Sequence, residues 1–338
     1  MGAALIVTAV AACSTAAPDR HQRADRLTQQ LRAMPGVVAA TADLANNVAQ
    51  GMVYFWLTVQ VADDITGDQL AALTAHYLDE LHAVDYTGYQ TELDVHRDRN
   101  VFVVDSDTRP VTNSDQITEQ ARRWVALRHE FPSATITFHA TITHPQGQSH
   151  TNGGPGGQTP PSDLGHPNTG VIELPEAADY TAVAATVTAL ATRFPDLSGG
   201  TWTISAGKAH PADITTTRRL PTPDEMRVWN ELNADQSIPH VDAMTINAAA
   251  TAPVWISEKT RSHDIAVAFQ LAGEHLATAA QLPAPVLYTS TDQIQAHRNY
   301  YGQTTSPVAI TIGGCTARTY PPDPAEQTLI ATYETCRR

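Results

Sequence analysis

The sequence has no concentration of positive charge and few aromatic residues. The formal net charge over 338 residues is −14, and no block of five like charges occurs. Binding to nucleic acid or to an anionic lipid surface requires a basic patch, so this charge balance argues against both as partners. Aromatic residues make up only 6% of the chain. This composition favours small, tightly packed units over one large aromatic core.

Motifs typical of catalysis or nucleotide binding are also missing. No Gly-x-Ser-x-Gly sequence occurs, and the segment Ser205-Ala206-Gly207-Lys208 lacks the spacing of a phosphate-binding loop. The segment HRDRN at residues 96–100 lacks the residues that a kinase catalytic loop has between its Asp and Asn. We interpret it as a polar hairpin turn. The sequence therefore predicts no enzyme, no catalytic residue and no cofactor.

Four histidines and an aspartate gather around one glycine-rich segment: His139, His144, His150, His166 and Asp163. Imidazole and carboxylate groups can ligate zinc or copper. The step of five residues from His139 to His144 places these two side chains on opposite faces of a strand, and the other two histidines lie in the segment itself. Solvent-exposed histidines are the preferred interpretation, and we predict no metal site.

An apolar run at residues 5–13 is too short to cross a membrane, because a helical span needs about 20 residues. Its end, Val10-Ala11-Ala12-Cys13, resembles the lipobox of bacterial envelope lipoproteins of the actinobacterial type. The resemblance implies that residues 1–12 are a signal peptide, that Cys13 is the lipid attachment site, and that the remainder is lipid-anchored on the extracytoplasmic face of the cell membrane. Residues 1–4 contain no Lys or Arg, so we expect the true start upstream. The alternative is a frayed N-terminus or a short buried strand.

Acylation of Cys13 leaves two of the three cysteines, Cys315 and Cys336, to be explained. In an oxidising compartment we expect them to form a disulfide that fastens residues 316–338 to the body of the protein. In the chain-entropy model, closing this loop stabilises the fold by about 3 kcal/mol. The alternative is two unpaired buried thiols.

Similar segments recur along the chain. A hydrophobic–Pro–x–(Val or Ala) step occurs at Pro35, Pro132 and Pro239. Each step comes directly after a helical pattern. Proline at this position ends the predicted helix. After each step come two strand-like runs, a second helix and one or two further strands. The predicted strands cover residues 37–41, 53–61, 91–95, 101–105, 134–143, 170–174, 202–205, 241–247, 254–257, 286–288 and 308–312.

The second helix of each unit carries an apolar stripe at helical spacing. In the first unit, Thr66 and Gln69 form a capping-box pair at its start. The stripes consist of Leu70, Leu73, Tyr77 and Leu81; Val183, Val187, Leu190 and Phe194; and Ile265, Phe269, Ala272 and Leu276.

We therefore predict an α+β fold of three tandem ferredoxin-like (αββαββ) two-layer sandwich units with antiparallel sheets. The predicted division is a signal peptide at 1–12, a lipidated linker at 13–21, and units at 22–108, 112–212 and 218–338, the last with the disulfide-fastened tail. The alternative is one irregular α+β domain.

One segment of the second unit interrupts this pattern. Residues 146–168 are rich in Gly, Pro and Ser with almost no apolar residue, so we expect a disordered loop.

Tyr54, Phe55 and Trp56 are adjacent on one strand, and both faces of that strand cannot be core. We expect Tyr54 or Trp56 to face a helix of a neighbouring unit or solvent, and we prefer an inter-unit contact over a ligand platform.

The function predicted from these observations is a non-enzymatic lipoprotein whose α/β units form a surface for another envelope protein or polymer. The alternative is a small-ligand or lipid carrier, which requires an apolar pocket between units. A hydrolase or metal-dependent enzyme is less favoured, since it requires polar residues to converge from different units.

Overall fold

A computed structural model describes residues 17–47, 52–84, 86, 89–106, 114–140, 168–247, 252–293, 297–298, 304–305, 307–318 and 321–336. Cys13 and the predicted signal peptide lie outside the described residues. So do residues 146–167 of the glycine-rich segment, including His150, Asp163 and His166, and His144 just before it.

The helices are α1 (His21–Arg32), α2 (Gly67–Ala83), α3 (Ser114–Glu130), α4 (Tyr180–Arg193), α5 (Pro223–Ala234), α6 (Ile265–Ala279) and α7 (Pro324–Tyr333), with a 3-10 turn η2 (Pro195–Leu197). The main strands are β1 (Val37–Asn47), β2 (Met52–Val61), β3 (Gln90–Arg97), β4 (Asn100–Ser106), β5 (Thr135–Ala140), β6 (Asn168–Glu173), β7 (Thr201–Ser205), β8 (Asp213–Thr217), β9 (His240–Ile246), β10 (Val254–Thr260), β11 (Val286–Thr291) and β14 (Val308–Ile312). A separate two-stranded ribbon pairs β12 (His297–Arg298) with β13 (Thr304–Thr305).

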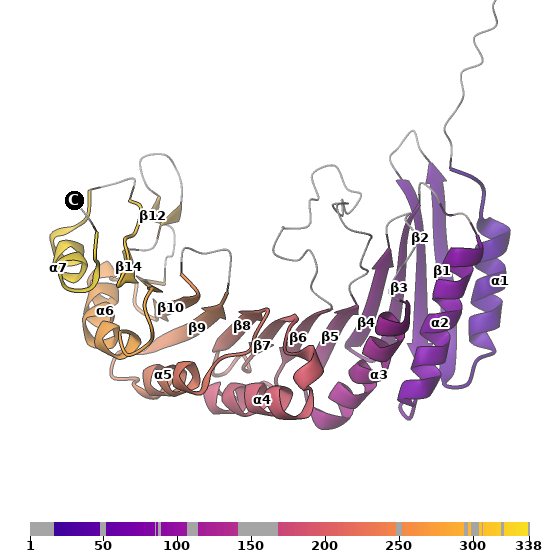
Figure 1. Ribbon diagram of the computed structural model, residues 1–338, viewed down its shortest axis with the longest axis horizontal. Coiled ribbons are helices and arrows are strands. Elements are labelled where there is room, and N and C mark those ends of the chain that lie inside the picture. The colour runs from indigo at the N-terminus through magenta and orange to yellow at the C-terminus, as the bar shows by residue number, and fades with distance from the viewer. Residues whose placement is uncertain are drawn as a thin grey trace, which may run out of the picture.

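One mixed sheet of 12 strands runs through the molecule in sequence order, from β1 to β11 and then β14 (Figure 1). Antiparallel and parallel pairs alternate: β1 and β2 form a hairpin, α2 crosses over, and β3 returns parallel to β2. The same helix–strand–strand unit occurs six times, led by α1, α2, α3, α4, α5 and α6. A parallel pair requires such a crossover, because a tight turn can join only antiparallel strands.

The prediction of three ferredoxin-like sandwiches with antiparallel sheets is wrong. β4 pairs with β5 in parallel across the first expected boundary, and β8 pairs with β9 in parallel across the second. These two parallel strand pairs have the same form as the parallel pair of β2 and β3 inside the first predicted unit. The chain therefore forms a single α/β architecture in which the repeating element is half as long as predicted.

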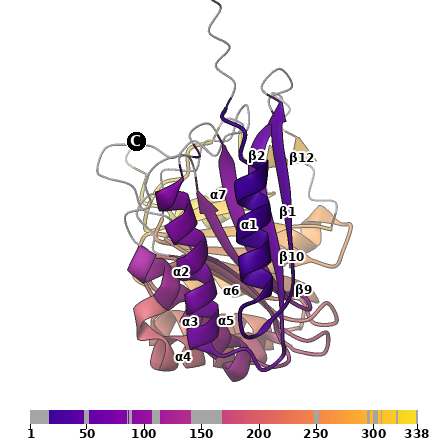
Figure 2. The same ribbon diagram turned by 90° about the vertical axis from the view of Figure 1, so that its right-hand side faces the viewer.

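Helices α1 to α6 all cover one face of the sheet, and the sheet curves so that its other face is concave (Figure 1). Seen from the β1 edge, α1 and α2 stand next to each other in front of the strands (Figure 2). Burial alternates along the strands as this arrangement requires: on β9 and β10 every second residue is buried under the helices. Within the described part of the chain, no helix combines the length and the apolar character needed to cross a bilayer.

The sequence anticipated the local structure of most helices. The capping box at α2 is confirmed, since the Thr66 side chain accepts from the Gln69 backbone N–H and the Gln69 side chain accepts from the Thr66 backbone N–H. The predicted stripe of α4 is buried. On α6, Ala272 and Leu276 of the predicted stripe are buried and Phe269 packs against the core, whereas Ile265 is 38% exposed. The buried face of the helix also includes Ala268, Leu271, His275 and Ala279.

Aromatic residues link neighbouring repeats beneath the helices. Phe138 on β5 lies between Phe102 on β4 and Trp202 on β7, with ring-centroid distances of 6.2 and 5.6 Å. Trp124 from α3 packs on Phe102, and the four side chains are fully buried. They bridge the boundary that the sequence analysis placed between units one and two. The core is therefore continuous along the sheet, despite the low aromatic content.

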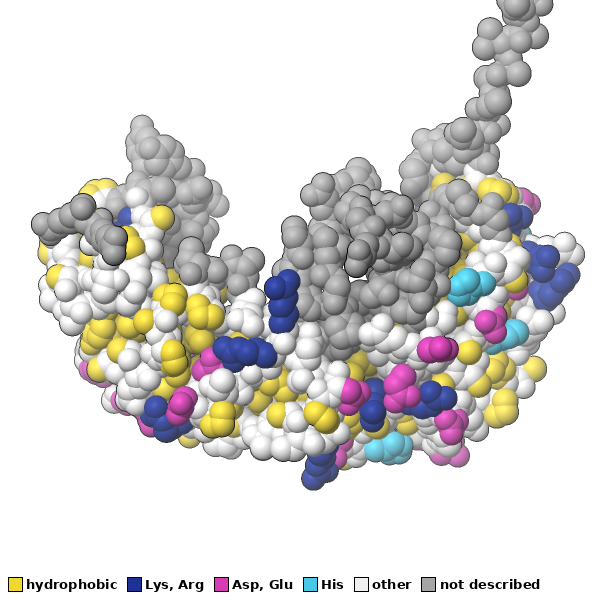
Figure 3. Space-filling model, viewed as in Figure 1, with side chains coloured by type: hydrophobic (Ala, Val, Ile, Leu, Met, Phe, Trp, Pro, Cys, Tyr) yellow, Lys and Arg dark blue, Asp and Glu magenta, His cyan; other side chains and the backbone are white. Residues whose placement is uncertain are grey.

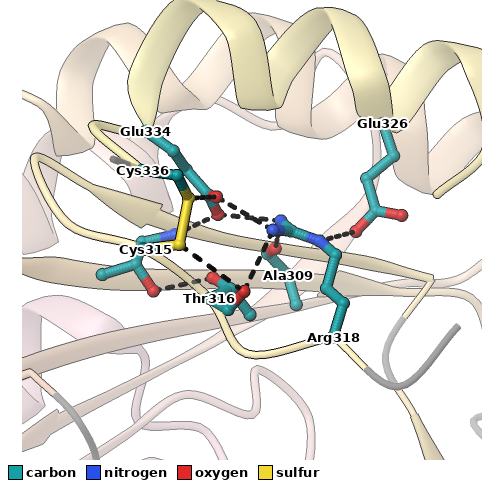
Figure 4. The surroundings of a disulfide bond; sticks show 8 residues. Ala309, Cys315, Thr316, Arg318, Glu326, Glu334 and Cys336 are labelled. Carbon is teal, nitrogen blue, oxygen red and sulfur yellow. Dashed lines mark hydrogen bonds and ion pairs between the residues drawn. A yellow bond between two sulfur atoms is a disulfide. The ribbon is translucent and has the colours of Figure 1, made fainter. Parts of the chain in front are cut away.

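The C-terminal tail covers the free edge of β14 (Figure 4). Arg318 Nη2 donates to the Ala309 carbonyl at 2.6 Å, and the Thr311 N–H donates to Glu334 Oε1 at 3.1 Å. Arg318 also pairs with Glu326 and Glu334. Side chains of the tail thus occupy the hydrogen-bonding groups that an edge strand otherwise presents to other molecules.

A disulfide joins Cys315, just after β14, to Cys336, just after α7 (Figure 4). The two Cα atoms are 4.9 Å apart and the sequence separation is 21 residues. The Gly313 N–H donates to the Tyr333 carbonyl, and the Thr335 N–H donates to the Gly314 carbonyl. The tail is therefore held by a covalent bond and by backbone hydrogen bonds at the position that the sequence analysis proposed.

Candidate functional site

Threonine is the commonest residue on the concave, helix-free face of the sheet, which is called the open face below. Strand register places one residue of each strand in a single row across this face. Strands lie about 4.8 Å apart, so twelve of them span about 50 Å. The row consists of Ala39, Gln60, His96, Val101, Thr137, Val171, Thr203, Thr215, Thr245, Trp255, Leu287 and Thr311.

A neighbouring row has the same character. It runs over eight strands from β1 to β8 and includes His139, which the sequence analysis considered as a metal ligand. His139 is half-buried on β5, between Val103 and Thr169. The space-filling view shows that the molecule is hollowed on this side (Figure 3). The row consists of Thr41, Thr58, Asp94, Val103, His139, Thr169, Thr201 and Thr217.

Tyr54 and Trp56 form an aromatic stack on β2 at the N-terminal end of the open face. Their ring centroids are 4.0 Å apart, with an interplanar angle of 19°, and the Tyr54 hydroxyl donates to Asp43 Oδ2 at 3.2 Å. Trp56 is 41% exposed, whereas Phe55 between them is fully buried under the helices. The preferred prediction of an inter-unit contact is therefore wrong, because the parity of β2 directs both rings to the open face.

The charged side chains at the described positions of this face are mostly acidic. Among the described residues of this face there is one lysine, Lys259, and there are five carboxylates, which lie on β1, β3, β6 and β8. Such a field repels polyanions and leaves an uncharged or a basic ligand as the electrostatically compatible partner. The carboxylates are Asp43, Glu92, Asp94, Glu173 and Asp213.

A groove of about 460 Å³ adjoins the open face where β5, β6 and β7 meet their turns. Its lining includes charged and hydroxyl side chains, among them Arg99, Thr135, Glu173 and Lys208. The carrier alternative requires an apolar pocket between units, whereas this groove has side chains of both charges in its lining. It continues the open face at the ends of strands β5, β6 and β7.

A second polar cluster lies buried on the opposite, helix-covered face. β9 contributes His240 and Asp242, β10 contributes Glu258 directly opposite Asp242, and α6 contributes His275 above them. Tyr288 on β11 completes the group. All five are at most 3% exposed, so their polar atoms depend on one another for hydrogen bonds and charge balance.

Short contacts connect most of this cluster. His275 Nδ1 lies 2.8 Å from Glu258 Oε1, and the Tyr288 hydroxyl donates to Glu258 Oε2. His240 Nδ1 lies 2.6 Å from the Ile238 carbonyl oxygen, which directs His240 Nε2 toward Asp242 Oδ2 at 3.3 Å. The two imidazole rings meet edge to face with centroids 5.0 Å apart.

The surroundings shift the protonation of these groups. Burial by itself lowers the pKa of His240, but the adjacent Asp242 carboxylate outweighs it and raises the pKa to about 9. Burial also lowers the pKa of His275, and the hydrogen bond to Glu258 reverses that effect and raises the pKa. Burial raises the pKa of Glu258. The cluster therefore attracts positive charge, either protons or a cation.

None of the residues of this cluster was predicted from the sequence as a site. Its candidate histidines were those near residues 146–168, of which only His139 lies among the described residues. A usable signal was present in the parity of β9, where His240 and Asp242 share a face with Met244 and Ile246. A carboxylate and an imidazole on the buried face of a strand demand partners.

Comparison with known proteins provides no family to guide the assignment: no protein-family model matches the chain, and neither a curated protein nor a solved structure is significantly similar to it.

Proposed function

We propose that the protein is a non-enzymatic, lipid-anchored binding component of the bacterial cell envelope, and that its open face binds an uncharged polysaccharide. The observation that supports this proposal is the sheet itself. Twelve strands are covered by helices on one side and form a concave face on the other, where threonine is the commonest residue. A surface about 50 Å long suits an extended polymer better than a small molecule.

The chemistry of the open face favours a glycan over other envelope polymers. A threonine hydroxyl both donates and accepts hydrogen bonds, as a sugar hydroxyl does. The exposed Tyr54–Trp56 stack offers a flat apolar surface against which a sugar ring can pack. The acidic side chains of the face disfavour anionic polymers and nucleic acid.

The proposed anchor at Cys13 would bring the β1 edge close to the membrane. Ala17 and Pro18 are fixed to the sheet, because Asn46 Nδ2 donates to the Ala17 carbonyl and the Tyr89 hydroxyl donates to the Pro18 carbonyl. Four residues of extended chain reach about 14 Å. A lipid on Cys13 therefore leaves little room for a spacer, and the sheet would extend away from the bilayer from its N-terminal edge. Membrane fractionation of Cys13→Ala tests this: we expect release, and retention of the variant at the wild-type level would contradict the anchor.

Binding is tested with the purified Cys13→Ala protein and insoluble, protein-free neutral cell-wall polysaccharide in a co-sedimentation assay. We expect Trp56→Ala to weaken binding about tenfold or more, since an aromatic anchor contributes on the order of 2 kcal/mol. The matched control is Ile265→Ala, which removes an exposed hydrophobic side chain on the helix-covered side and should leave binding unchanged. Binding only to basic proteins, abolished by salt, would contradict the glycan assignment.

A further inference from the structure

The buried cluster beneath α6 has the composition of a metal centre. His240, Glu258 and His275 present ligand atoms that all lie within 4.8 Å of one another. Two donors bound to a common zinc ion at 2.0–2.2 Å are about 3.4 Å apart in tetrahedral geometry. Small side-chain movements would therefore bring these atoms to one ion.

One observation independent of this proximity points to a cation at Asp242. Both carboxylate oxygens of Asp242 are buried without a hydrogen-bond partner, and His240 Nε2, 3.3 Å from Oδ2, likewise makes no hydrogen bond. A buried carboxylate without hydrogen bonds is strongly unfavourable. A divalent ion in contact with Asp242 and His240 would satisfy these atoms and neutralise the two carboxylates that face each other across β9 and β10.

The outer contacts of the candidate ligands match those of metal-bound residues. The backbone carbonyl of Ile238 accepts from His240 Nδ1, so Nε2 is left as the metal donor. His275 Nε2 points to Asp235 Oδ2 at 3.6 Å, so Nδ1 is the donor that faces Glu258. The Tyr288 hydroxyl donates to the Glu258 oxygen remote from His275. His240 and Glu258 thus each have an outer hydrogen-bond partner that fixes the side chain, and His275 Nε2 has an ion-pair neighbour in Asp235.

We propose that His240 Nε2, His275 Nδ1 and Glu258 bind one divalent transition-metal ion of the zinc type, with Asp242, whose Oδ2 lies 3.3 Å from His240 Nε2, as the fourth ligand. Nitrogen and carboxylate donors of this kind suit zinc, and four protein ligands close the site. All four are buried, so the ion would have a structural role, joining β9, β10 and α6. Asp235, 3.6 Å from His275 Nε2, is half-exposed, so this side of the cluster lies near the surface. The site does not depend on the polysaccharide proposed above.

The test uses tag-free protein carrying Cys13→Ala, stripped of metal with a chelator and kept without reductant so that the disulfide stays closed. Zinc is titrated against a chromophoric competitor, cobalt is used to record the absorption bands of a tetrahedral nitrogen–oxygen site, and the melting temperature is followed. We expect one ion per chain with an apparent Kd below about 0.1 µM and a higher melting temperature with metal. The proposal is overturned if the apparent Kd of the wild-type protein for zinc is above about 10 µM.

Two variants assign the ligands. Asp242→Asn and His240→Gln should each weaken zinc binding about 100-fold or more and remove the metal-dependent rise in melting temperature. The matched control, His263→Gln, changes an exposed histidine near the start of α6 and should bind as the wild type does. Asp242→Asn is the decisive variant, because it keeps the shape of a side chain that makes no hydrogen bond and should preserve folding of the metal-free protein. Wild-type affinity in both variants would exclude this site.

Discussion

Gly170 on β6 lies beside Trp202 on β7, and a Cβ atom at position 170 would be 2.2 Å from Cζ3 of the indole ring. The ring is fully buried, and its Nε1 donates to the Leu197 carbonyl at 2.9 Å. The tryptophan thus occupies the space that any other residue at position 170 would need. This pair sets the packing of the parallel joint between the third and fourth repeats.

We predict that Gly170→Ala destabilises the protein by about 2–3 kcal/mol, because neither the ring nor the strand can move without disturbing the core. Urea unfolding gives the free energy of unfolding. In the background Trp202→Leu the same substitution should cost much less, and the double-mutant cycle measures the difference. Equal costs in both backgrounds would contradict the packing argument.

Gly273→Ala is the matched control for this substitution. Gly273 lies exposed on α6, and no neighbouring atom is within 4 Å of the place that an alanine methyl group would take. Alanine in a helix interior is favoured over glycine, so we expect stabilisation of about 0.5–1 kcal/mol. The two Gly→Ala substitutions should therefore have opposite signs.

The sequence predicted individual elements well because their information is local. Alternating residues identified most strands, and the helix that begins at Thr66 is marked by its own cap. The pairing of strands is not local: the same helix between two hairpins can close a sandwich or extend a sheet. The parallel joint at Val101 and Thr137 is indistinguishable in sequence from the joint at Tyr54 and Gln90. Three closed units were therefore predicted where six repeats continue one sheet.

The candidate sites were harder to predict, for two different reasons. The open face results from strand order, so no single segment reveals it. On β9, period two is compatible with either face, since Val241 and Ala243 alternate with His240 and Asp242. Over the first four residues an apolar-inside rule selects the wrong set, and only Met244 and Ile246 mark the buried face. α6 is apolar on several sides, so an apolar stripe through Ile265, Ala272 and Leu276 gives no sign that His275 is buried beside it.

Glu225 at the start of α5 provides a prediction for acid stability. Its side chain is buried, accepts from both Arg219 Nη atoms at 2.7 and 2.6 Å, and accepts from the Thr222 N–H at 2.7 Å. Burial favours a higher pKa for Glu225, but these donors outweigh it and lower the pKa below its usual 4.5. The stabilisation is therefore complete above about pH 4.5 and is lost as the pH falls through the lowered value.

Glu225→Gln should accordingly reduce the free energy of unfolding at pH 7 by about 1–3 kcal/mol, and the difference from wild type should shrink on acidification. The control is Glu231→Gln on the same helix, where the exposed pair with Arg227 contributes little. Chemical denaturation at a series of pH values checks both. If the difference in the free energy of unfolding between wild type and Glu225→Gln grew toward low pH, the pKa of Glu225 would not be lowered in the folded protein.

Thiol alkylation before and after reduction tests the disulfide between Cys315 and Cys336. Under denaturing, non-reducing conditions Cys315 and Cys336 should resist alkylation, and after reduction both should react. Reduction should also lower stability by about 3 kcal/mol in the chain-entropy model, since the bond closes a loop with a separation of 21 residues. Alkylation of both cysteines before reduction would contradict the bond.

Arg318 performs the task that a further strand would otherwise perform at the β14 edge. It is the hydrogen-bond donor to Ala309 and the counter-charge for Glu326 and Glu334, whose side chains are at most 1% exposed. Arg318→Ala leaves two buried carboxylates without their cation, an arrangement that costs about 3–5 kcal/mol and that the tail can avoid by detaching. Detachment exposes the Thr311 N–H and the Ala309 carbonyl together.

We therefore predict faster hydrogen exchange at Thr311 in Arg318→Ala, and self-association when Cys315→Ser and Cys336→Ser are added, because the tail is then no longer tethered beside the strand. Hydrogen exchange with mass spectrometry and sedimentation velocity measure the two effects. Arg227→Ala, which removes an exposed arginine on α5, should change neither. An edge strand with free N–H and carbonyl groups pairs with a second copy of itself, so the associated species should be a dimer joined through β14. A triple variant that stays monomeric with a protected Thr311 amide would show that other residues cover this edge.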